Sequence, residues 1–251
     1  MVAEDDEPRR IRSSRRPASR LAISMKSDSL KSIISTEINR YAALSQTLDR
    51  TFPRRVIELG DVELEDNIGD QLIQLDLKRK QLMSVGILDL DSEESLALPK
   101  KKIEKSLARV LSVYIEDNRK KLESLNEIYE RVSLFRRLMA DRFKKKKITI
   151  SRSGGIDISY NDKHINLTSL SSGEQYKLVL FFEMLFEIES NTLILIDEPE
   201  ISLHVAWQKA FIEGLTEIIE LNKFDVVLAT HSPQLIGKRY DDLAVELSGA
   251  A

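Results

Sequence analysis

The chain has 251 residues, 42% of them hydrophobic, and a formal net charge of -3 at pH 7, which is enough for one large or two small domains with a real core. It contains no cysteine, which excludes a disulfide framework and thiolate metal or redox chemistry. The longest apolar runs, LVLFF and LILI, are far shorter than the roughly 18 residues of a membrane span, so we expect a cytoplasmic protein with no membrane partner.

Residues 1–24 are rich in Arg and Ser but lack the apolar stretch of a secretory signal, so we predict a poorly ordered basic tail. Such a basic segment can neutralise the phosphates of a nucleic acid. Neither basic cluster of the chain is interleaved with aromatic residues as a single-strand stacking platform would be, so DNA binding and a plain solvated surface both remain open. The two clusters are Arg9, Arg10, Arg12, Arg15, Arg16 and Arg20, and Arg136, Arg137, Arg142 and Lys144 to Lys147.

Residues 25–146 have the pattern of a highly charged helical region. Apolar residues recur at three- and four-residue steps from Leu30 to Leu48, and Pro53 is expected to interrupt that helix because proline lacks a backbone donor. A shorter helix is predicted at about 72–83, followed by the acidic connector LDLDSEE. The same spacing returns from Ile103 to Met139, which predicts a long amphipathic helix or a short antiparallel coiled coil.

After Lys147 the apolar period changes from helical to alternating. The segment ITISRSGGIDISYNDKHINL predicts a hairpin followed by a short strand, and a helix is expected from Gly173 to about Glu189. The runs TLILIDEPE and DVVLATHSP predict parallel strands buried on both faces, whose carboxyl ends face a site. A helix at about 203–221 lies between them, so residues 147–251 have the order expected of an α/β parallel sheet.

Polar residues gather at the start of one helix and at the ends of the two strands. The turn LTSLSSGEQ leads into a helix whose first-turn amides and partial positive charge suit an anion. Asp197 and Glu198 end one strand, so alternation lets one hold a metal while the other faces a nucleophilic water. His231 ends the next strand, where it is either functional or merely hydrogen-bonded.

The order LSSGEQ, LILIDEPE, SLH and ATHSP resembles the carboxyl half of an ABC-type ATPase, in the soluble, AAA-like bacterial group related to OLD-type, RecF-type and SMC-type proteins. The resemblance implies an α/β fold in which a partial P-loop NTPase lobe at 147–251 carries the region 25–146 as a helical insertion. It also implies that Asp197 is the Walker B aspartate supporting Mg²⁺, that Glu198 polarises the attacking water, and that His231 is the switch histidine sensing the γ-phosphate of ATP.

The remaining motif positions are implied to bind ATP across a dimer interface. Ser172 stands where the signature usually has its first glycine, and Val205 stands where many relatives have proline. For His204, a packing role at the interface is an open alternative. The implied nucleotide-binding residues are Ser171, Ser172, Gly173 and Glu174 of the signature and Ser202 and His204 of the D-loop region.

A Walker A phosphate loop is missing from the sequence. It requires Gly, four residues and then Gly-Lys-Ser/Thr, but of the nine glycines only Gly237 is followed by lysine, and Arg239 comes next. Three interpretations follow: a piece of a longer ATPase, a split subunit, or a non-hydrolytic relative whose helices bind protein or DNA. We expect ATP hydrolysis and ATP-dependent dimerisation, with a homodimer or a complementing lobe as partner, in DNA maintenance or antiphage defence.

Overall fold

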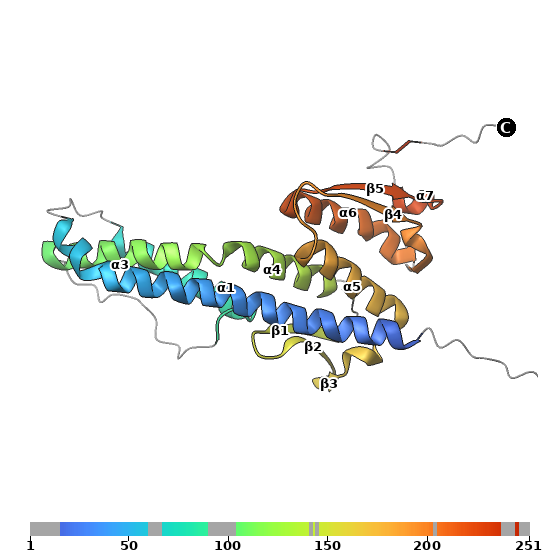
Figure 1. The fold of residues 1–251 in the computed structure, drawn as a ribbon, viewed down its shortest axis with the longest axis horizontal. Coiled ribbons are helices and arrows are strands. Elements are labelled where there is room, and N and C mark those ends of the chain that lie inside the picture. The colour runs from blue at the N-terminus through green and yellow to red at the C-terminus, as the bar shows by residue number, and fades with distance from the viewer. Residues whose placement is uncertain are drawn as a thin grey trace, which may run out of the picture.

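A computed structural model of the protein describes residues 16–59, 67–89, 104–140, 143, 146–202, 205–236 and 244–245. These residues are mostly helical, with two small sheets (Figure 1). The first part of the chain forms four helices, which we call the helical arm: α1 (Arg16–Glu58), α2 (Ile68–Ser84), α3 (Lys105–Glu123) and α4 (Asn126–Ala140).

The second part of the chain contains the two sheets and the remaining helices. Strands β1 (Lys146–Ser151), β2 (Gly155–Tyr160) and β3 (Lys163–Ile165) are followed by η1 (Leu167–Ser169) and α5 (Ser172–Phe186). Then come β4 (Leu193–Asp197), η2 (Pro199–Ser202), α6 (Val205–Asn222), β5 (Asp225–Ala229) and α7 (Pro233–Ile236). The predicted hairpin and the strand–helix–strand order are therefore present.

Helix α1 differs from its prediction at both ends. It begins at Arg16, so residues 16–24 are helical and only residues 1–15 of the predicted tail lie outside the described part. It also continues through Pro53. The helix lacks the bond from residue 53 to the Asp49 carbonyl, while in the turn before it Thr51 Oγ1 donates to Thr47 O at 3.1 Å and Arg55 Nη2 donates to Leu48 O at 2.8 Å.

The second predicted helical stretch, from Ile103 to Met139, is divided by a turn. Helix α3 ends at Glu123 and α4 begins at Asn126. Leu122, in the last turn of α3, and Leu125, in the break itself, are both buried, so the apolar spacing continues although the backbone turns. The acidic connector, from residue 90 onward, lies outside the described residues.

The antiparallel sheet β1–β2–β3 packs on the arm through one apolar face. Ile148, Ile150, Ile156 and Ile158 are buried, as alternation in a half-buried sheet requires. Helix α1 crosses the hairpin so closely that Ser27 Oγ accepts the Ile156 N–H at 3.0 Å. Gly155 has φ +69°, and a Cβ there would lie 2.6 Å from the Ser27 carbonyl oxygen, so this crossing needs glycine.

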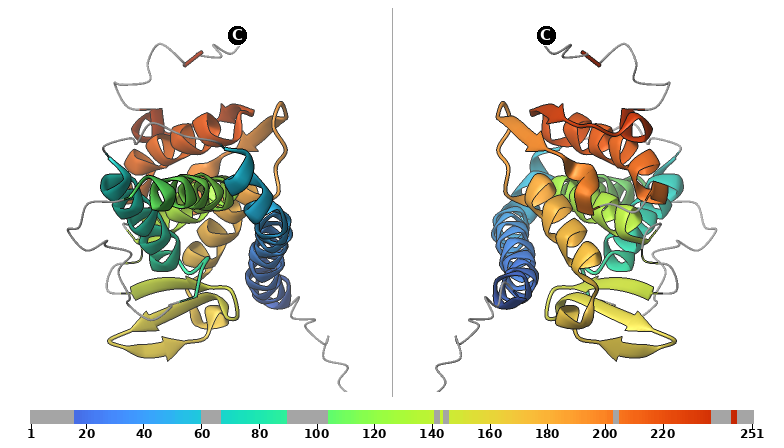
Figure 2. Two further views of the ribbon diagram at one scale, coloured as in Figure 1. Left: turned by 90° about the vertical axis from the view of Figure 1, so that its left-hand side faces the viewer. Right: turned by 90° about the vertical axis from the view of Figure 1, so that its right-hand side faces the viewer.

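Helix α5 is held between two helices of the arm. On one side, Lys26 of α1 pairs with Glu183 at 2.8 Å and Glu187 at 2.6 Å. On the other side, Phe135 of α4 stacks edge-on against Phe182, with 6.2 Å between ring centroids. Views along the long axis show these helices lying between the two sheets (Figure 2).

The second sheet consists of β4 and β5, which pair in parallel from Leu193 opposite Asp225 to Asp197 opposite Ala229. Its expected burial on both faces is wrong for the described residues. Side chains on one face pack towards the core, whereas Leu193, Leu195 and Val227 on the other face are 60%, 73% and 55% exposed. The described part of the chain provides no cover for this face, which we call the bare sheet face.

Candidate functional site: the ends of β4 and β5

Parallel pairing brings the ends of β4 and β5 together, and with them the two predicted catalytic residues. Glu198 follows β4 and its N–H donates to Ala229 O of β5 at 2.8 Å. His231 follows β5, and its Nε2 lies 3.5 Å from Glu198 Oε1. The imidazole is 90% exposed. Asp197 points to the other side, on the same face as Leu195, and is exposed.

The backbone at Glu198 is in an uncommon conformation. Its φ is +43°, a left-handed value that a non-glycine residue adopts at a cost of order 1–3 kcal/mol. The surroundings hold Glu198 in this conformation, because its own N–H is bonded to Ala229 O and the next residue, Pro199, is buried. Such outliers occur at functional sites as well as at turn residues, here Asn191 and Lys223, and Glu198 has one whereas Asp197 does not.

Glu200 belongs to the same corner, although the sequence analysis assigned it no role. Its Oε1 accepts the Thr230 hydroxyl at 2.6 Å and the His231 N–H at 2.8 Å. Burial alone would raise the pKa of this carboxyl, but the hydrogen bonds from Thr230 and from backbone amides outweigh it and lower the pKa. The sequence signal was its position, two residues after Glu198 and directly after a proline.

The predicted signature turn forms the N-terminus of α5. Ser171 is the N-cap, and a capping box joins it to Glu174: the Ser171 hydroxyl and N–H donate to Glu174 Oε2 at 2.8 and 2.9 Å, and the Glu174 N–H donates back at 3.4 Å. Lys146 of β1 donates to the other carboxylate oxygen at 2.5 Å. Burial raises the pKa of Glu174, but the bonds from Lys146 and Ser171 lower it below its usual value.

The same turn leaves room for an external anion. Ser171 and Ser172 are exposed and Gly173 is half-buried. The amides of Ser172 and Gly173 belong to the first helical turn, where no intrahelical acceptor exists. Behind them Gln175 is buried and donates to Thr168 O at 3.1 Å and Leu170 O at 2.9 Å, which fixes the approach to the helix.

The structure does not bring every predicted residue into one site. Helix α5 ends beside the C-terminus of α6, where Asn222 donates to Met184 O at 2.7 Å, and β4 begins at that end as well. The N-terminus of α5 and the carboxyl end of β4 therefore lie away from this junction, on different layers of the molecule (Figure 1). Ser202 ends η2, and His204 lies outside the described residues.

A profile of the AAA ATPase domain family matches residues 13–236. The chain belongs to this family. The predicted resemblance to this group of ATPases is thereby confirmed, and ATPase-type function follows at the level of the family. The match extends over the helical arm as well as the strands.

Two further comparisons concern individual proteins. Over 107 residues this AAA ATPase domain is 25% identical to Protein ea59 of Escherichia phage lambda, a match that covers 43% of the chain and 20% of that protein. Among solved structures, the Smc head domain with an extended coiled coil bound to the C-terminal domain of ScpA, from Pyrococcus furiosus, is similar with 16% identity and a TM-score of 0.29. That match covers 87% of this chain and 52% of the other. The chain thus spans about a fifth and about half of these two proteins.

Asp197 fits the part of a Mg²⁺ ligand only together with a nucleotide. The described residues contain no group of three or more His, Cys, Asp or Glu side chains that could hold a metal ion. Mg²⁺ in nucleotide sites typically uses one or two carboxylates, with phosphate oxygens and water completing its octahedron. Asp197, exposed at a strand end, would supply one such carboxylate.

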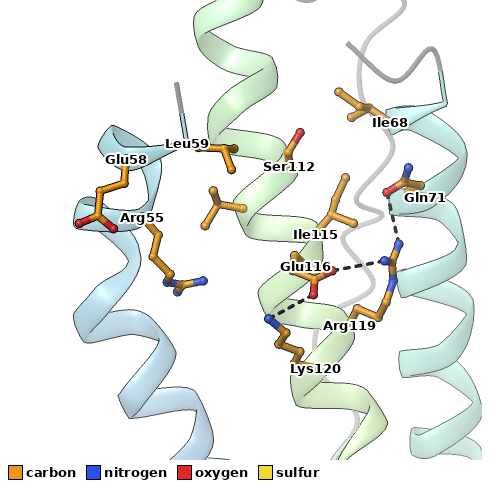
Figure 3. A pocket seen from close by; sticks show the side chains of 11 residues that line it. Arg55, Glu58, Leu59, Ile68, Gln71, Ser112, Ile115, Glu116, Arg119 and Lys120 are labelled. Atoms are coloured by element: carbon orange, nitrogen blue, oxygen red, sulfur yellow. Dashed lines mark hydrogen bonds and ion pairs between the residues drawn. The ribbon is translucent and has the colours of Figure 1, made fainter. Parts of the chain in front are cut away.

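A cleft of about 540 Å³ lies at the far end of the helical arm, away from both candidate segments. Figure 3 shows it between α1, α2 and α3, with Arg119 and Lys120 both directed at Glu116, at 3.3 and 3.1 Å. Because the cations Arg55, Arg119 and Lys120 are matched in number by the carboxylates Glu58, Glu116 and Asp117, the cleft is a poor site for a triphosphate. It contains none of the residues predicted to bind ATP.

Three of the four described residues of the second basic cluster are engaged within the protein. Arg136 donates to Ser84 O, Arg137 pairs with Glu217, and Lys146 pairs with Glu174. These pairs favour the structural interpretation over DNA binding for these three residues. The side chains of the first cluster lie outside the described part of the chain. No helix within the described ranges has the length and hydrophobicity to span a membrane.

Proposed function

We propose that this chain is the part of an ATPase that carries the catalytic carboxylate and the signature helix, and that it hydrolyses ATP with Mg²⁺ once a phosphate-binding lobe is added. The observation that carries the proposal is the convergence of Glu198 and His231 at the ends of two paired parallel strands. The family assignment supports the reaction class. The missing Gly-x4-Gly-Lys motif supports a lobe supplied by another segment or chain.

Each residue of the corner has a role that its geometry suits. Asp197 would hold Mg²⁺, which when bound neutralises the charge that develops on the phosphates. Glu198 would accept a hydrogen bond from the attacking water and orient it. His231, exposed and next to Glu198, would donate to the γ-phosphate. Phosphoryl transfer requires mainly such positioning and charge stabilisation.

The N-terminus of α5 would act on a nucleotide held by a second molecule. The Ser172 and Gly173 amides point out of the helix end, and their exposure supports contact in trans. The Ser171 hydroxyl already donates its hydrogen bond to the Glu174 carboxylate, and Lys146 neutralises the charge of that carboxylate. A γ-phosphate would therefore approach the two amides while Lys146 limits its repulsion by Glu174. This arrangement would make ATP join two protomers and hydrolysis release them.

The bare sheet face would be covered by the added lobe. Parallel sheets occur almost only with both faces covered, whereas Leu195 is 73% exposed here. An apolar helix packed on Leu193, Leu195 and Val227 would complete the layer beside Asp197. The phosphate loop of that lobe would then lie at the same edge as the catalytic corner.

ATP turnover by the complete protein, or by this chain mixed with the complementing lobe, tests the proposal. Mg²⁺-dependent hydrolysis is expected, and Glu198→Gln should reduce kcat by at least ~100-fold while ATP remains bound, since orienting the water is its role. Glu189→Gln makes the same chemical change in an exposed loop residue and should leave turnover unaffected. Undiminished hydrolysis in Glu198→Gln would refute the assignment.

A second candidate is a non-hydrolytic interaction module. Exposed apolar residues on the arm favour it: Ile57, Ile73 and Leu107 are 77%, 50% and 48% exposed. This function predicts that the complete protein ignores ATP and associates through the arm.

The support for a role in DNA maintenance or antiphage defence is the resemblance of the four motifs to that group of ATPases.

A further inference from the structure

The position of His231 has to be set by its backbone. Its side chain is 90% exposed, so no side chain of the described residues encloses the imidazole. The backbone N–H, however, donates to Glu200 Oε1 at 2.8 Å, and the preceding Thr230 hydroxyl donates to the same oxygen at 2.6 Å. One carboxylate oxygen thus binds the two residues that lead from β5 into the loop.

Glu200 is itself fixed relative to Glu198. The two residues lie on either side of the buried Pro199, and the Glu198 N–H is bonded to Ala229 O. The segment 198–200 therefore crosses the segment 229–231 with three hydrogen bonds, one from Glu198 and two to Glu200. These bonds determine how far the Glu198 carboxylate lies from the His231 ring.

The loop is anchored from its other side as well. The Thr230 hydroxyl accepts the Ser232 N–H at 3.0 Å, and the Ser232 hydroxyl donates to Gln208 Oε1 of α6 at 2.9 Å. Glu200 is therefore at one end of a chain of hydrogen bonds through Thr230 and Ser232 to α6. Its other oxygen, Oε2, is buried and has no hydrogen-bond partner among the described residues, so the bonds to Oε1 carry its role.

We propose that Glu200 is the positioning residue that holds His231 beside Glu198. The inference builds on the proposed function, in which Glu198 and His231 act on ATP. Glu200 does not touch the nucleotide in this scheme. It acts through the backbone of residue 231, so that the imidazole stays within reach of the γ-phosphate when the site is assembled.

Amide hydrogen exchange on the isolated chain tests the positioning without any nucleotide. In Glu200→Ala the His231 amide loses a charge-assisted bond and should exchange about tenfold faster or more, while the amide of Val227 within β5 changes less than twofold. Glu200→Gln keeps an acceptor oxygen and should stay within about threefold of wild type. Glu220→Ala, at the far end of α6, is the matched control and should change neither amide.

Glu200→Asp covers the case in which the alanine variant does not fold, because it keeps the charge and shortens the side chain by one methylene. Its His231 amide should exchange at least about fivefold faster. Exchange within twofold of wild type in either folded variant, alanine or aspartate, overturns the proposal.

Turnover by the complete ATPase separates positioning from general stability. Glu200→Ala and Glu200→Asp should lower kcat at least about tenfold with the KM for ATP within about twofold, and Glu200→Gln should restore kcat to within about threefold. A raised KM at unchanged kcat contradicts the positioning role. If the wild-type protein does not hydrolyse ATP, the proposed function fails, while the exchange experiment still decides whether Glu200 holds His231.

Discussion

Leu195→Glu should leave the isolated chain as stable as the wild type but prevent the added lobe from docking. The residue is 73% exposed, and exposed substitutions usually change stability by within about 0.5 kcal/mol. The parts of Leu193, Leu195 and Val227 still exposed amount to about two whole side chains, and burying a side chain yields about 1.5–3 kcal/mol. Docking would therefore gain about 3–6 kcal/mol from this face. A glutamate in its middle removes part of that gain and buries an unpaired carboxylate, which costs several kcal/mol more.

Urea denaturation of the isolated chain and the affinity for the complementing lobe measure the two effects. The affinity should fall at least ~100-fold, which corresponds to about 2.7 kcal/mol. Ile194→Glu is the matched control, because Ile194 is the preceding residue and packs against the core on the opposite face. It should unfold the isolated chain. A loss of more than about 1.5 kcal/mol in the isolated chain on Leu195→Glu would show that this face is already covered, and would refute the reasoning.

Two further predictions concern ion pairs. Glu174→Gln weakens the cap of α5 and should cost about 1 kcal/mol at pH 7. Since the pKa of Glu174 is lowered below 4.5 by folding, its contribution is complete above that pH and is lost as the pH falls through the folded value, so urea denaturation of the variant should vary less with pH in that acidic range. Arg55→Ala leaves the Asp117 carboxylate, 4% exposed, without its partner and should cost about 3–5 kcal/mol in thermal unfolding, whereas Arg54→Ala, 74% exposed, should cost about 0.5 kcal/mol or less. The first prediction is contradicted if the stability of Glu174→Gln varies with acidic pH as much as that of the wild type. The second is contradicted if Arg55→Ala and Arg54→Ala lose the same stability.

The strands could be predicted from sequence because their signals are local. Alternation with a Gly-Gly turn indicated β1 and β2, and short apolar runs ending in polar residues indicated β4 and β5. The pairing of parallel strands then brought Glu198 and His231 together without further information. What a run such as LILI cannot show is where its cover comes from, so the prediction of two buried faces was wrong for the residues described.

Other features depend on contacts between distant residues. The continuation of α1 through Pro53 overrides the local proline signal, since most helical stability in proteins comes from tertiary packing. The role of Glu200 appears only when residue 231, thirty-one positions later, is placed beside it. The capping box could have been predicted from the sequence, because Ser171 and Glu174 have the S-x-x-E spacing of such a cap. The sequence analysis did not use this spacing.

Helix α1 runs from its contact with α5 to the far end of the helical arm. At 1.5 Å per residue, the 43 residues of α1 form a rod about 64 Å long. One end is pinned to α5 through Lys26, and the other is pinned to α3 through Arg55 and Asp117. One continuous helix therefore joins the C-terminal end of α5, where Glu183 and Glu187 lie, to α3 at the far end of the arm.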